Sequence, residues 1–418
     1  MNRRDFLRRS AAMTALGMLP LGLGGWVWGG GGPGHARTKR LIVVFLRGAV
    51  DGLSVVAPYT DPLYFAARPR IALPKPGTDG GLIDLDGRFG LHPALERLVP
   101  LWKSGSLAFV HACGSPDPTR SHFDAQDYME SGLPGRKGTV DGWMNRLLSV
   151  LPAPHGPTQA VSFGPTIPRI LEGHMAVSNM ALERNAAKLI PVDRPRIGRA
   201  FDALYSGRDA LSVAYQQGQE ARQTLLDDLD QVNEERQMAD HGAPSPVGFG
   251  KDTDQLARML ALDPSIKLAF LALGGWDTHI NQGAQLANHL RPLAEGLTGL
   301  VQGLGDAFAD TTILVMSEFG RTFRENGDAG TDHGHGNVMW VLGGNVQGGK
   351  VYGTWPGLGD DQLYQKRDLA VTTDFRTVVG SVLTGHLGLM TPQLARVLPG
   401  MPPADSSLAG LIRPTKTS

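Results

Sequence analysis

Six short apolar runs, each ending in glycine, dominate the pattern of the chain. The first is RLIVVFLRG at 40–48, and the others lie at 106–114, 159–164, 266–275, 311–320 and 337–344. An unbroken apolar run that stops at a turn residue is typical of a strand buried on both faces, as in a parallel sheet. The pattern therefore predicts six buried strands.

Helical patterns separate these runs. Apolar residues recur at helical spacing in HPALERLVPLWKSG at 92–105, in the long stretch at 285–308 and in FRTVVGSVLTGHLGL at 375–389. Strands that alternate with helices indicate an α/β fold with helices on both faces of a mainly parallel sheet. We expect a three-layer α/β/α sandwich over residues 40–400.

The middle of the chain breaks this alternation. Residues 212–237 form a charged, amphipathic pattern that predicts a long helix, and a linker-like stretch rich in glycine and proline follows it. We interpret 165–250 as a helical insertion that caps the sheet. Residues 401–418 read as a proline-containing tail.

The first residues read MNRRDFLRR and lead into a weakly apolar stretch. Paired arginines, one residue and then Phe-Leu resemble a twin-arginine export signal, which predicts a signal peptide over 1–36. The resemblance implies the twin-arginine export machinery as a partner, a periplasmic or secreted location, and no stable membrane span after cleavage. The alternative is an ordinary N-terminal membrane anchor.

Charge and cysteine content narrow the function. The 418 residues carry 40 Lys+Arg against 40 Asp+Glu, so the formal net charge is zero and does not indicate a nucleic-acid partner. Cys113 is the only cysteine, so no intramolecular disulfide can form. The folded protein must therefore be stabilised by its hydrophobic core, and a bound metal would add to that stability.

Polar clusters fall at the ends of the predicted strands, where open α/β sheets bind their ligands. They comprise Arg47 and Asp51, the stretch 119–127, Asp277 and His279, Glu318 and Arg321, and finally Asp332, His333 and His335 before the sixth strand. We expect these groups, which are distant in sequence, to meet at one edge of the sheet.

Carboxylates and histidines in these clusters are candidate metal ligands. Asp277 and His279 lie two residues apart in WDTH, so both face one side of an extended segment. The alternative is that Asp277 or Thr278 caps a helix. Asp51 is either a ligand or a turn residue that accepts backbone hydrogen bonds.

The SEFGR and TDHGHG motifs supply the remaining candidates. Glu318 is either a ligand or one half of a surface ion pair, and at least one of His333 and His335 is expected to be a ligand. Interleaved glycines let the backbone approach closely and adopt positive φ. Mixed carboxylate and imidazole ligands favour Zn²⁺ or Mn²⁺, whereas carboxylates alone would suit Mg²⁺ or Ca²⁺.

The stretch DPTRSHFDAQDYMESG contains the candidate nucleophiles. A helix is expected over 121–131, and Thr119 or Ser121 at its start could attack a substrate or simply cap the helix. His122 and Asp124 lie nearby but cannot share one helical face tightly, so neither is a predicted site residue. The candidate anion-binding residues are Arg47, Arg120 and Arg321.

A nucleophile, an anion clamp and metal ligands together indicate metal-assisted hydrolysis of a phosphate or sulfate ester. The substrate would be a small anionic ester or a sulfated or phosphorylated glycan. The alternative is a non-catalytic exported binding or assembly protein that keeps the fold around a degenerate metal site.

The same motifs resemble those of one bacterial family. The N-terminal signal, LIVVFLRGAVDGLSVVAPY, RSHFDAQDYMESG, SEFGRT and GTDHGHGNVMWVLGG are similar to the exported family called domain of unknown function 1501. That family resembles a branch of the alkaline-phosphatase-like superfamily, which includes sulfatases. The resemblance implies an alkaline-phosphatase-like α/β/α sandwich and usually two metals.

Matched by position, the resemblance implies that Asp51 is the first aspartate ligand and that Asp277 and His279 are the Asp/His pair. His333 or His335 resembles the final histidine. Phe319 stands where the superfamily has a histidine, which removes one ligand. Cys113 is followed by GSPDPTR and so lacks the Cys-x-Pro-x-Arg pattern of formylglycine sulfatases.

Overall fold

The computed structural model describes residues 38–153, 155–164, 166–180, 207 and 239–413. The signal peptide expected over 1–36 and the helix expected over 212–237 lie outside the described residues. No helix in the described part of the chain has both the length and the hydropathy needed to cross a bilayer.

All six predicted strands are present. They are β1 (Arg40–Leu46), β5 (Leu107–Gly114), β6 (Ala160–Phe163), β8 (Leu268–Leu273), β9 (Thr311–Met316) and β10 (Asn337–Gly343). Three short strands that the pattern did not reveal extend the sheet: β7 (Ser178–Met180), β11 (Val351–Tyr352) and β12 (Thr373–Asp374). Strands this short carry too few residues to produce a readable apolar run.

The strands form one mixed sheet in the order β11-β5-β10-β9-β1-β8-β6-β7, with β12 also pairing with β5. Strand β10 pairs antiparallel with both β9 and β5, whereas the other pairs in this sheet are parallel. The prediction of a mainly parallel sheet is therefore confirmed. The reversal of β10 has a consequence for the site, because its amino end lies at the carboxyl ends of its neighbours.

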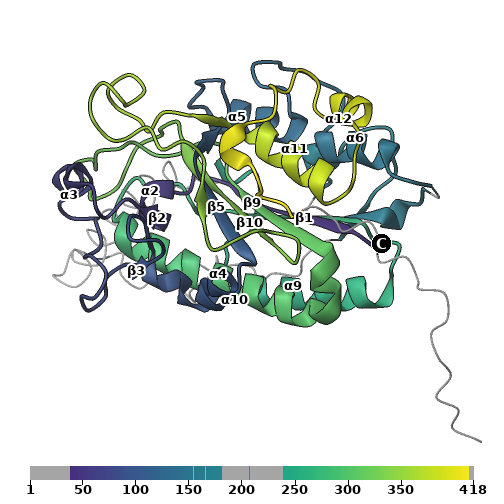
Figure 1. Cartoon of the computed structure of the whole chain (residues 1–418), viewed down its shortest axis with the longest axis horizontal. Helices are drawn as coiled ribbons and strands as arrows, with labels where there is room; N and C mark the ends of the chain where they lie inside the picture. The colour runs from purple at the N-terminus through teal and green to yellow at the C-terminus, as the bar shows by residue number, and fades with distance from the viewer. Residues whose placement is uncertain (1–37, 154, 165, 181–206, 208–238, 414–418) are drawn as a thin grey trace, which may run out of the picture. The chain divides into compact units, whose positions relative to one another are not determined.

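Helices cover both faces of the sheet (Figure 1). One face carries α5 (His122–Ser131), α6 (Trp143–Val150), α11 (Phe375–Gly385) and α12 (Thr391–Val397), and the other carries α4 (Val99–Lys103), α9 (Phe249–Leu262) and α10 (Gln282–Leu304). Successive residues of β1 belong to opposite core layers: Val43 and Phe45 pack on one face, and Ile42 and Val44 on the other. The predicted three-layer α/β/α arrangement is confirmed.

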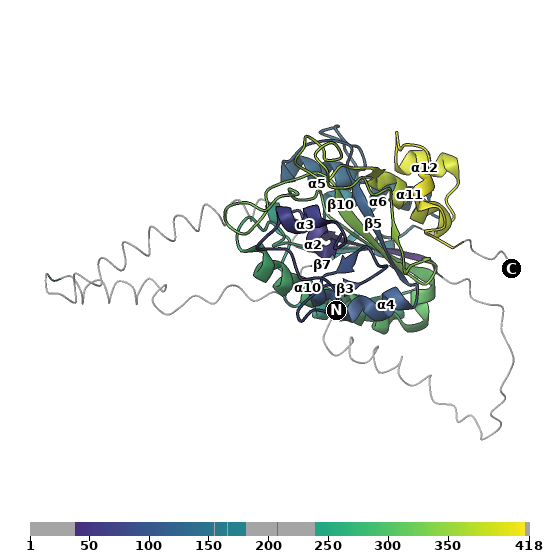
Figure 2. The same cartoon turned by 60° about the vertical axis from the view of Figure 1, so that its left-hand side comes forward.

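Smaller elements complete the fold. A second sheet joins β2 (Val56–Ala57), β4 (Gly90–Leu91) and β3 (Ile83–Asp84), near α2 (Gly52–Val55) and α3 (Pro62–Ala67). Helix α2 lies against β10 (Figure 2). The 3-10 helices are η1 (Pro93–Leu98), η2 (Pro157–Gln159), η3 (Arg169–Leu171), η5 (Gly305–Asp310) and η6 (Ser406–Leu408).

Two expected segment boundaries differ from the structure. The segment 165–250 does not stand wholly apart, because β7 joins the main sheet and α9, which begins at Phe249, packs on α10. Residues 401–413 are not a free tail, because Leu408 and Leu411 are buried in the core. In both places the apolar side chains that fix the segment are too few to form a readable pattern.

Because β1 is central and buried on both faces, its side chains should contribute strongly to stability. Phe45 is fully buried. We predict that Phe45→Ala lowers the free energy of unfolding by about 3–5 kcal/mol, measured by urea denaturation. Leu262→Ala is the control, since Leu262 is 85% exposed and should change stability by less than about 0.5 kcal/mol. Equal effects of the two substitutions would contradict this description of the core.

Candidate metal centre

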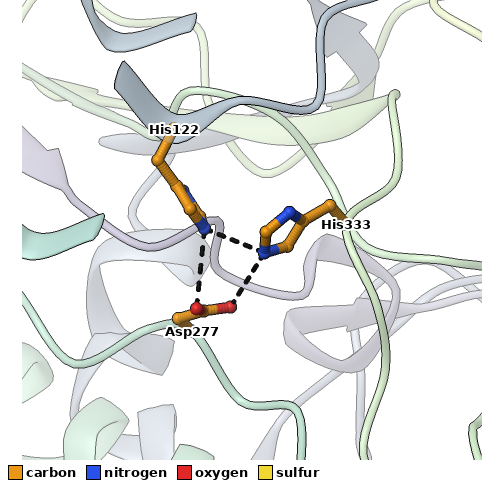
Figure 3. Close-up of side chains that lie close together, drawn as sticks. All are labelled: His122, Asp277 and His333. Carbon is orange, nitrogen blue, oxygen red and sulfur yellow. Dashed lines mark hydrogen bonds and ion pairs between the residues drawn. The ribbon is translucent and has the colours of Figure 1, made fainter. Parts of the chain in front are cut away.

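Four segments meet at the carboxyl edge of the sheet. Asp277 follows β8, Glu318 follows β9, and His122 opens α5. His333 comes from the loop before β10, which reaches the same edge because β10 runs antiparallel to β9 and β5. Figure 3 shows His122, Asp277 and His333 pointing toward one another from these segments.

The converging atoms are imidazole nitrogens and a carboxylate. His122 Nε2 lies 3.0 Å from His333 Nε2 and 3.6 Å from Asp277 Oδ2, and His333 Nε2 lies 3.3 Å from Asp277 Oδ1. Ligand atoms of these three residues all lie within 4.8 Å of one another. His279 adds a third ring at the exposed edge, with Nε2 at 2.9 Å from Asp277 Oδ1 and 3.0 Å from His333 Nε2.

The opposite nitrogen of each ring faces an oxygen that can only accept a hydrogen bond. In a metal-bound centre each neutral ring would therefore keep its proton on Nδ1 and direct the lone pair of Nε2 to the centre. Three lone pairs that face one another repel unless a cation lies between them. The Nδ1 contacts are His122 with Glu318 Oε1 at 2.7 Å, His333 with the Arg120 carbonyl at 3.0 Å and His279 with Asp332 Oδ1 at 3.2 Å.

These distances fit a metal. In a tetrahedral site with bonds of about 2.0–2.1 Å, neighbouring ligand atoms lie about 3.3 Å apart. Two distances between ring nitrogens and three between a ring nitrogen and an Asp277 oxygen span 2.9 to 3.6 Å. Metal-binding histidines also generally donate their second ring N–H to a carboxylate or carbonyl, as all three do here. His122, Asp277 and His333 could therefore hold one ion, with His279 beside them.

The charges within the centre reinforce one another. Burial alone would raise the pKa of the Asp277 carboxyl, but hydrogen bonds from His122, His279 and His333, together with the charge of Arg321, hold it well below its usual range. Burial alone would lower the pKa of His122, yet its contacts with Asp277 and Glu318 raise it to about 9. The pocket thus favours positive charge at the point where the rings meet.

Glu318 lies behind the centre instead of within it. The side chain is fully buried. Oε1 accepts hydrogen bonds from Gly48 N at 2.8 Å and Gln126 Nε2 at 2.9 Å as well as from His122, and Oε2 accepts one from Ser317 Oγ at 3.0 Å. The prediction that Glu318 is a ligand is not supported by this geometry, because its oxygens are already occupied. Its position instead fixes the His122 ring.

Asp51, also expected to be a ligand, belongs to a separate buried network. Arg68 Nη1 lies 2.5 Å from Oδ2 and Arg68 Nη2 lies 3.1 Å from Oδ1. Ser54 and Gln282 also donate to Oδ2, at 2.7 and 2.6 Å. With both oxygens paired, Asp51 stabilises the loop after β1 and does not reach the converging atoms.

The predicted anion clamps Arg321 and Arg47 are also buried and occupied. Arg321 donates to Asp277 Oδ1 at 2.6 Å and to Thr331, so it positions the carboxylate of the centre. Arg47 donates to Gln126 and to Glu130, the latter at 2.6 Å, and lines a separate pocket of about 390 Å³ beside α5. Neither guanidinium is free for an anion in this arrangement.

The stretch at the start of α5 has mainly structural contacts. Ser121 Oγ accepts from Asp124 N as the N-cap, and Thr119 Oγ1 accepts from Ser121 N. Among the described residues, no histidine or acidic side chain contacts either hydroxyl, so the capping alternative fits both. Arg120 pairs with Asp368 at 2.6 Å, while its carbonyl holds His333. A nucleophilic role for Thr119 or Ser121 stays a prediction.

The TDHGHG motif contributes one histidine and not two. His335 is buried and packs against Tyr364, with ring centroids 4.6 Å apart, away from the converging nitrogens. The Phe319 ring centroid lies 4.9 Å from that of His122 and 5.3 Å from that of His333. This ring forms an apolar wall beside the centre.

The glycines of the motif act through close approach. Gly320 N donates to the His335 carbonyl and Gly334 N donates to the Gly320 carbonyl, each at 2.8 Å. A Cβ on Gly334 would collide with the backbone of Arg321. The expected close approach is confirmed, whereas the expectation of positive φ is wrong, because Gly334 and Gly336 are not among the residues with positive φ.

His122 is the residue that sequence reasoning missed. Asp124, its nearest acidic neighbour in the sequence, lies on the same helix, and the two side chains cannot share one helical face. The actual partners of His122 come from three other segments, after β8, after β9 and before β10. The available signal was its position in the first turn of a helix that follows a buried strand, where side chains face the carboxyl edge of the sheet.

Comparison with known proteins places the chain in a family. The model described as "Protein of unknown function (DUF1501)" matches residues 107–399. The chain belongs to this family. No curated protein matches it.

Solved structures similar to this chain are distant. A protein in the alkaline phosphatase superfamily from Vibrio parahaemolyticus is 10% identical, with a TM-score of 0.39, over 76% of this chain and 62% of that one. The periplasmic domain of EcEptC from Escherichia coli is 9% identical, with a TM-score of 0.35, over 74% and 73%. The lipoteichoic acid synthase LtaP from Listeria monocytogenes is 10% identical, with a TM-score of 0.34, over 74% and 66%.

We predict that Glu318→Gln weakens metal binding by about 10- to 100-fold, because the neutral amide orients His122 less firmly than a carboxylate does. Affinity is measured by competition with a chromophoric chelator. Glu325→Gln is the matched control, since Glu325 is also largely buried and pairs with Arg70 outside the centre. Unchanged affinity in Glu318→Gln would show that Glu318 does not position a ligand.

Proposed function

We propose that this member of the DUF1501 family is an exported, metal-dependent hydrolase of phosphate or sulfate esters with one metal held by His122, Asp277 and His333. The observation that carries the proposal is the convergence of the Nε2 atoms of His122 and His333 on the buried Asp277 carboxylate. Three protein ligands leave a coordination position open, as catalytic sites require and fully ligated structural sites do not provide.

The ligand types favour Zn²⁺ or Mn²⁺. Imidazole binds both well, whereas Ca²⁺ and Mg²⁺ prefer a shell of oxygens that this centre does not offer. When bound, such a metal supplies Lewis-acid chemistry, polarising an ester oxygen and making water a stronger nucleophile.

The residues of the chain prepare the centre in advance. Glu318, the Arg120 carbonyl and Asp332 fix the three rings, and Arg321 fixes Asp277. Metal binding therefore needs little rearrangement of these side chains. Such preorganisation is the usual source of electrostatic stabilisation of the transition state in an enzyme site. His279, with a side chain 37% exposed, lies at the edge from which an ester would approach.

Water is the nucleophile that fits the described contacts. The hydroxyls of Thr119 and Ser121 serve as caps. Attack of water on phosphorus or sulfur would form one new P–O or S–O bond, break the ester bond and release an alcohol with phosphate or sulfate. The attacking water would release a proton to solvent at the exposed His279 edge, and the departing ester oxygen would take one up from solvent at the same edge to leave as the alcohol.

A second candidate function is a non-catalytic binding or assembly protein that retains one metal. This function is favoured because Asp51 and Glu318 are paired within buried networks and do not serve as metal ligands. The described residues contain one group that could hold a metal, whereas the superfamily usually has two metals. A metal that remains bound without any turnover would support this alternative.

We predict about one equivalent of zinc or manganese in the purified mature protein, measured by elemental analysis. His122→Ala and His333→Ala should each lose the metal, whereas His335→Ala should retain it because His335 lies outside the centre. His335 is a matched control from the same motif as His333. Equal loss in both variants of that motif would contradict the assignment of ligands.

The same preparations test catalysis. The metal-loaded protein should hydrolyse 4-nitrophenyl phosphate or 4-nitrophenyl sulfate, and a chelator should abolish the activity. Absence of both metal and turnover would overturn the hydrolase proposal and the metal-binding alternative together.

Export through the twin-arginine machinery is the second part of the proposal, supported by the MNRRDFL sequence. We predict that replacing Arg3 and Arg4 together by lysine keeps the precursor inside the cell, as detected by fractionation and immunoblotting. Replacing Arg8 and Arg9 by lysine preserves charge outside the paired motif and should leave export intact. Export of the Arg3/Arg4 variant would argue against this route, and full-length protein in the membrane fraction would indicate an anchor.

A further inference from the structure

A small cavity lies next to the exposed edge of the metal centre. Its volume is about 240 Å³, and its walls are formed by Thr322, Arg324, Glu325, Asp332, Lys366 and Arg367. Asp332 is shared with the centre, because its Oδ1 lies 3.2 Å from His279 Nδ1. One imidazole ring therefore separates this basic cavity from the converging nitrogens.

Positive charge predominates in the basic cavity. Glu325 is neutralised by Arg70, with Nε at 2.6 Å from Oε1, and also accepts two backbone hydrogen bonds. Arg324 has a long contact with Asp360, at 3.5 Å, and its guanidinium lies over the Phe323 ring, but its side chain is 61% exposed. Lys366 is exposed, and no ion pair involving it occurs among the described residues. These cations can accept a ligand without first breaking a strong pair.

Arg367 and Asp332 are the remaining charged residues that line the basic cavity. Arg367 lies 3.3 Å from Asp368 and its side chain is 40% exposed. Asp332 Oδ1 accepts a hydrogen bond from Asn326 Nδ2 at 3.3 Å and lies 3.2 Å from His279 Nδ1. Its oxygen toward His279 is engaged, so a bound anion would lie toward the three basic side chains.

The loop that presents Lys366 and Arg367 has an unusual backbone. Gln365 and Lys366 both have left-handed φ, at 53° and 56°, although neither is glycine. Such conformations cost energy and persist where surrounding contacts enforce them, often at functional sites. Here Tyr364 N donates to the Asp368 carbonyl at 2.8 Å, and Asp368 N donates back to Tyr364 at 3.0 Å.

Arg120 connects this loop to the metal centre. The Arg120 side chain binds Asp368 at 2.6 Å and Gln365 at 2.9 Å, while the Arg120 carbonyl accepts the Nδ1 hydrogen bond of His333. The spacing between the basic side chains and the converging nitrogens is therefore fixed by one residue. A rigid spacing is what recognition of a second group on one substrate requires.

We propose that the basic cavity is a second anion subsite, which binds a further phosphate or sulfate group on the ester being cleaved. The inference rests on the proposed hydrolase function and narrows its substrate class to polyanionic esters, such as multiply phosphorylated or sulfated sugars. Guanidinium and ammonium groups are the side chains that bind such groups through charge-assisted hydrogen bonds.

The test measures binding calorimetrically with the metal-loaded mature protein. Fructose 1,6-bisphosphate is compared with fructose 6-phosphate, and a disulfated with a monosulfated disaccharide, so that the two arms distinguish phosphate from sulfate recognition. The doubly charged member of at least one pair should bind at least about tenfold more tightly. The variant Lys366→Ala/Arg367→Ala should abolish this preference and leave the affinity for the singly modified sugar unchanged.

Lys103→Ala is the control, because Lys103 is an exposed lysine on α4 that does not line the cavity. Lys366→Ala alone serves as a milder variant, and retained metal content shows that the centre is intact. No preference in the wild-type protein, or a preference that survives in the double variant, would overturn the subsite. Absence of turnover with an intact, Lys366-dependent preference would instead overturn the hydrolase proposal and leave an anion-binding protein.

Discussion

The hydrogen bonds from the Nδ1 atoms of His122, His279 and His333 are the interactions on which the metal centre depends. Each one ends on an oxygen that cannot donate, so each ring keeps Nδ1 on that oxygen and turns Nε2 toward Asp277. Without these contacts the rings could rotate or change tautomer, and the lone pairs would no longer meet. The acceptors come from three different segments, which ties the loops after β9, before α5 and before β10 into one arrangement. The rest of the carboxyl edge serves to hold these acceptors in place.

Much of the fold was readable from the sequence because the six main strands are buried on both faces and appear as unbroken apolar runs. The two- and three-residue strands at the sheet edges were not readable, since their pairing depends on neighbours and not on their own residues. Among the candidate ligands, Asp277, His279 and His333 do come together. Asp51 and Glu318 do not join them, because the partners that occupy their oxygens include Arg68, Gln282 and Gln126, which are distant in sequence. His122 was missed for the same reason: its partners lie in other segments.

The reversal of β10 explains why a loop that precedes a strand can complete a site that otherwise follows strands. In a fully parallel sheet the TDHGHG loop would lie at the opposite edge from Asp277. The glycines then allow this loop to pack directly on the backbone after β9. Phe319 supports the His122 and His333 rings as an apolar wall. Together these features form one compact group of side chains that could hold a metal ion, with a basic cavity beside its exposed edge.

The central claim is that imidazole nitrogens of this chain bind one divalent metal. X-ray absorption spectroscopy of the metal-loaded mature protein tests it most directly, because the fine structure reports the type and distance of the ligand atoms. The account predicts at least two imidazole nitrogens and one carboxylate oxygen at about 2.0–2.2 Å in the zinc-loaded protein. A first shell made only of oxygens would contradict it, because such a shell excludes His122 and His333 as ligands.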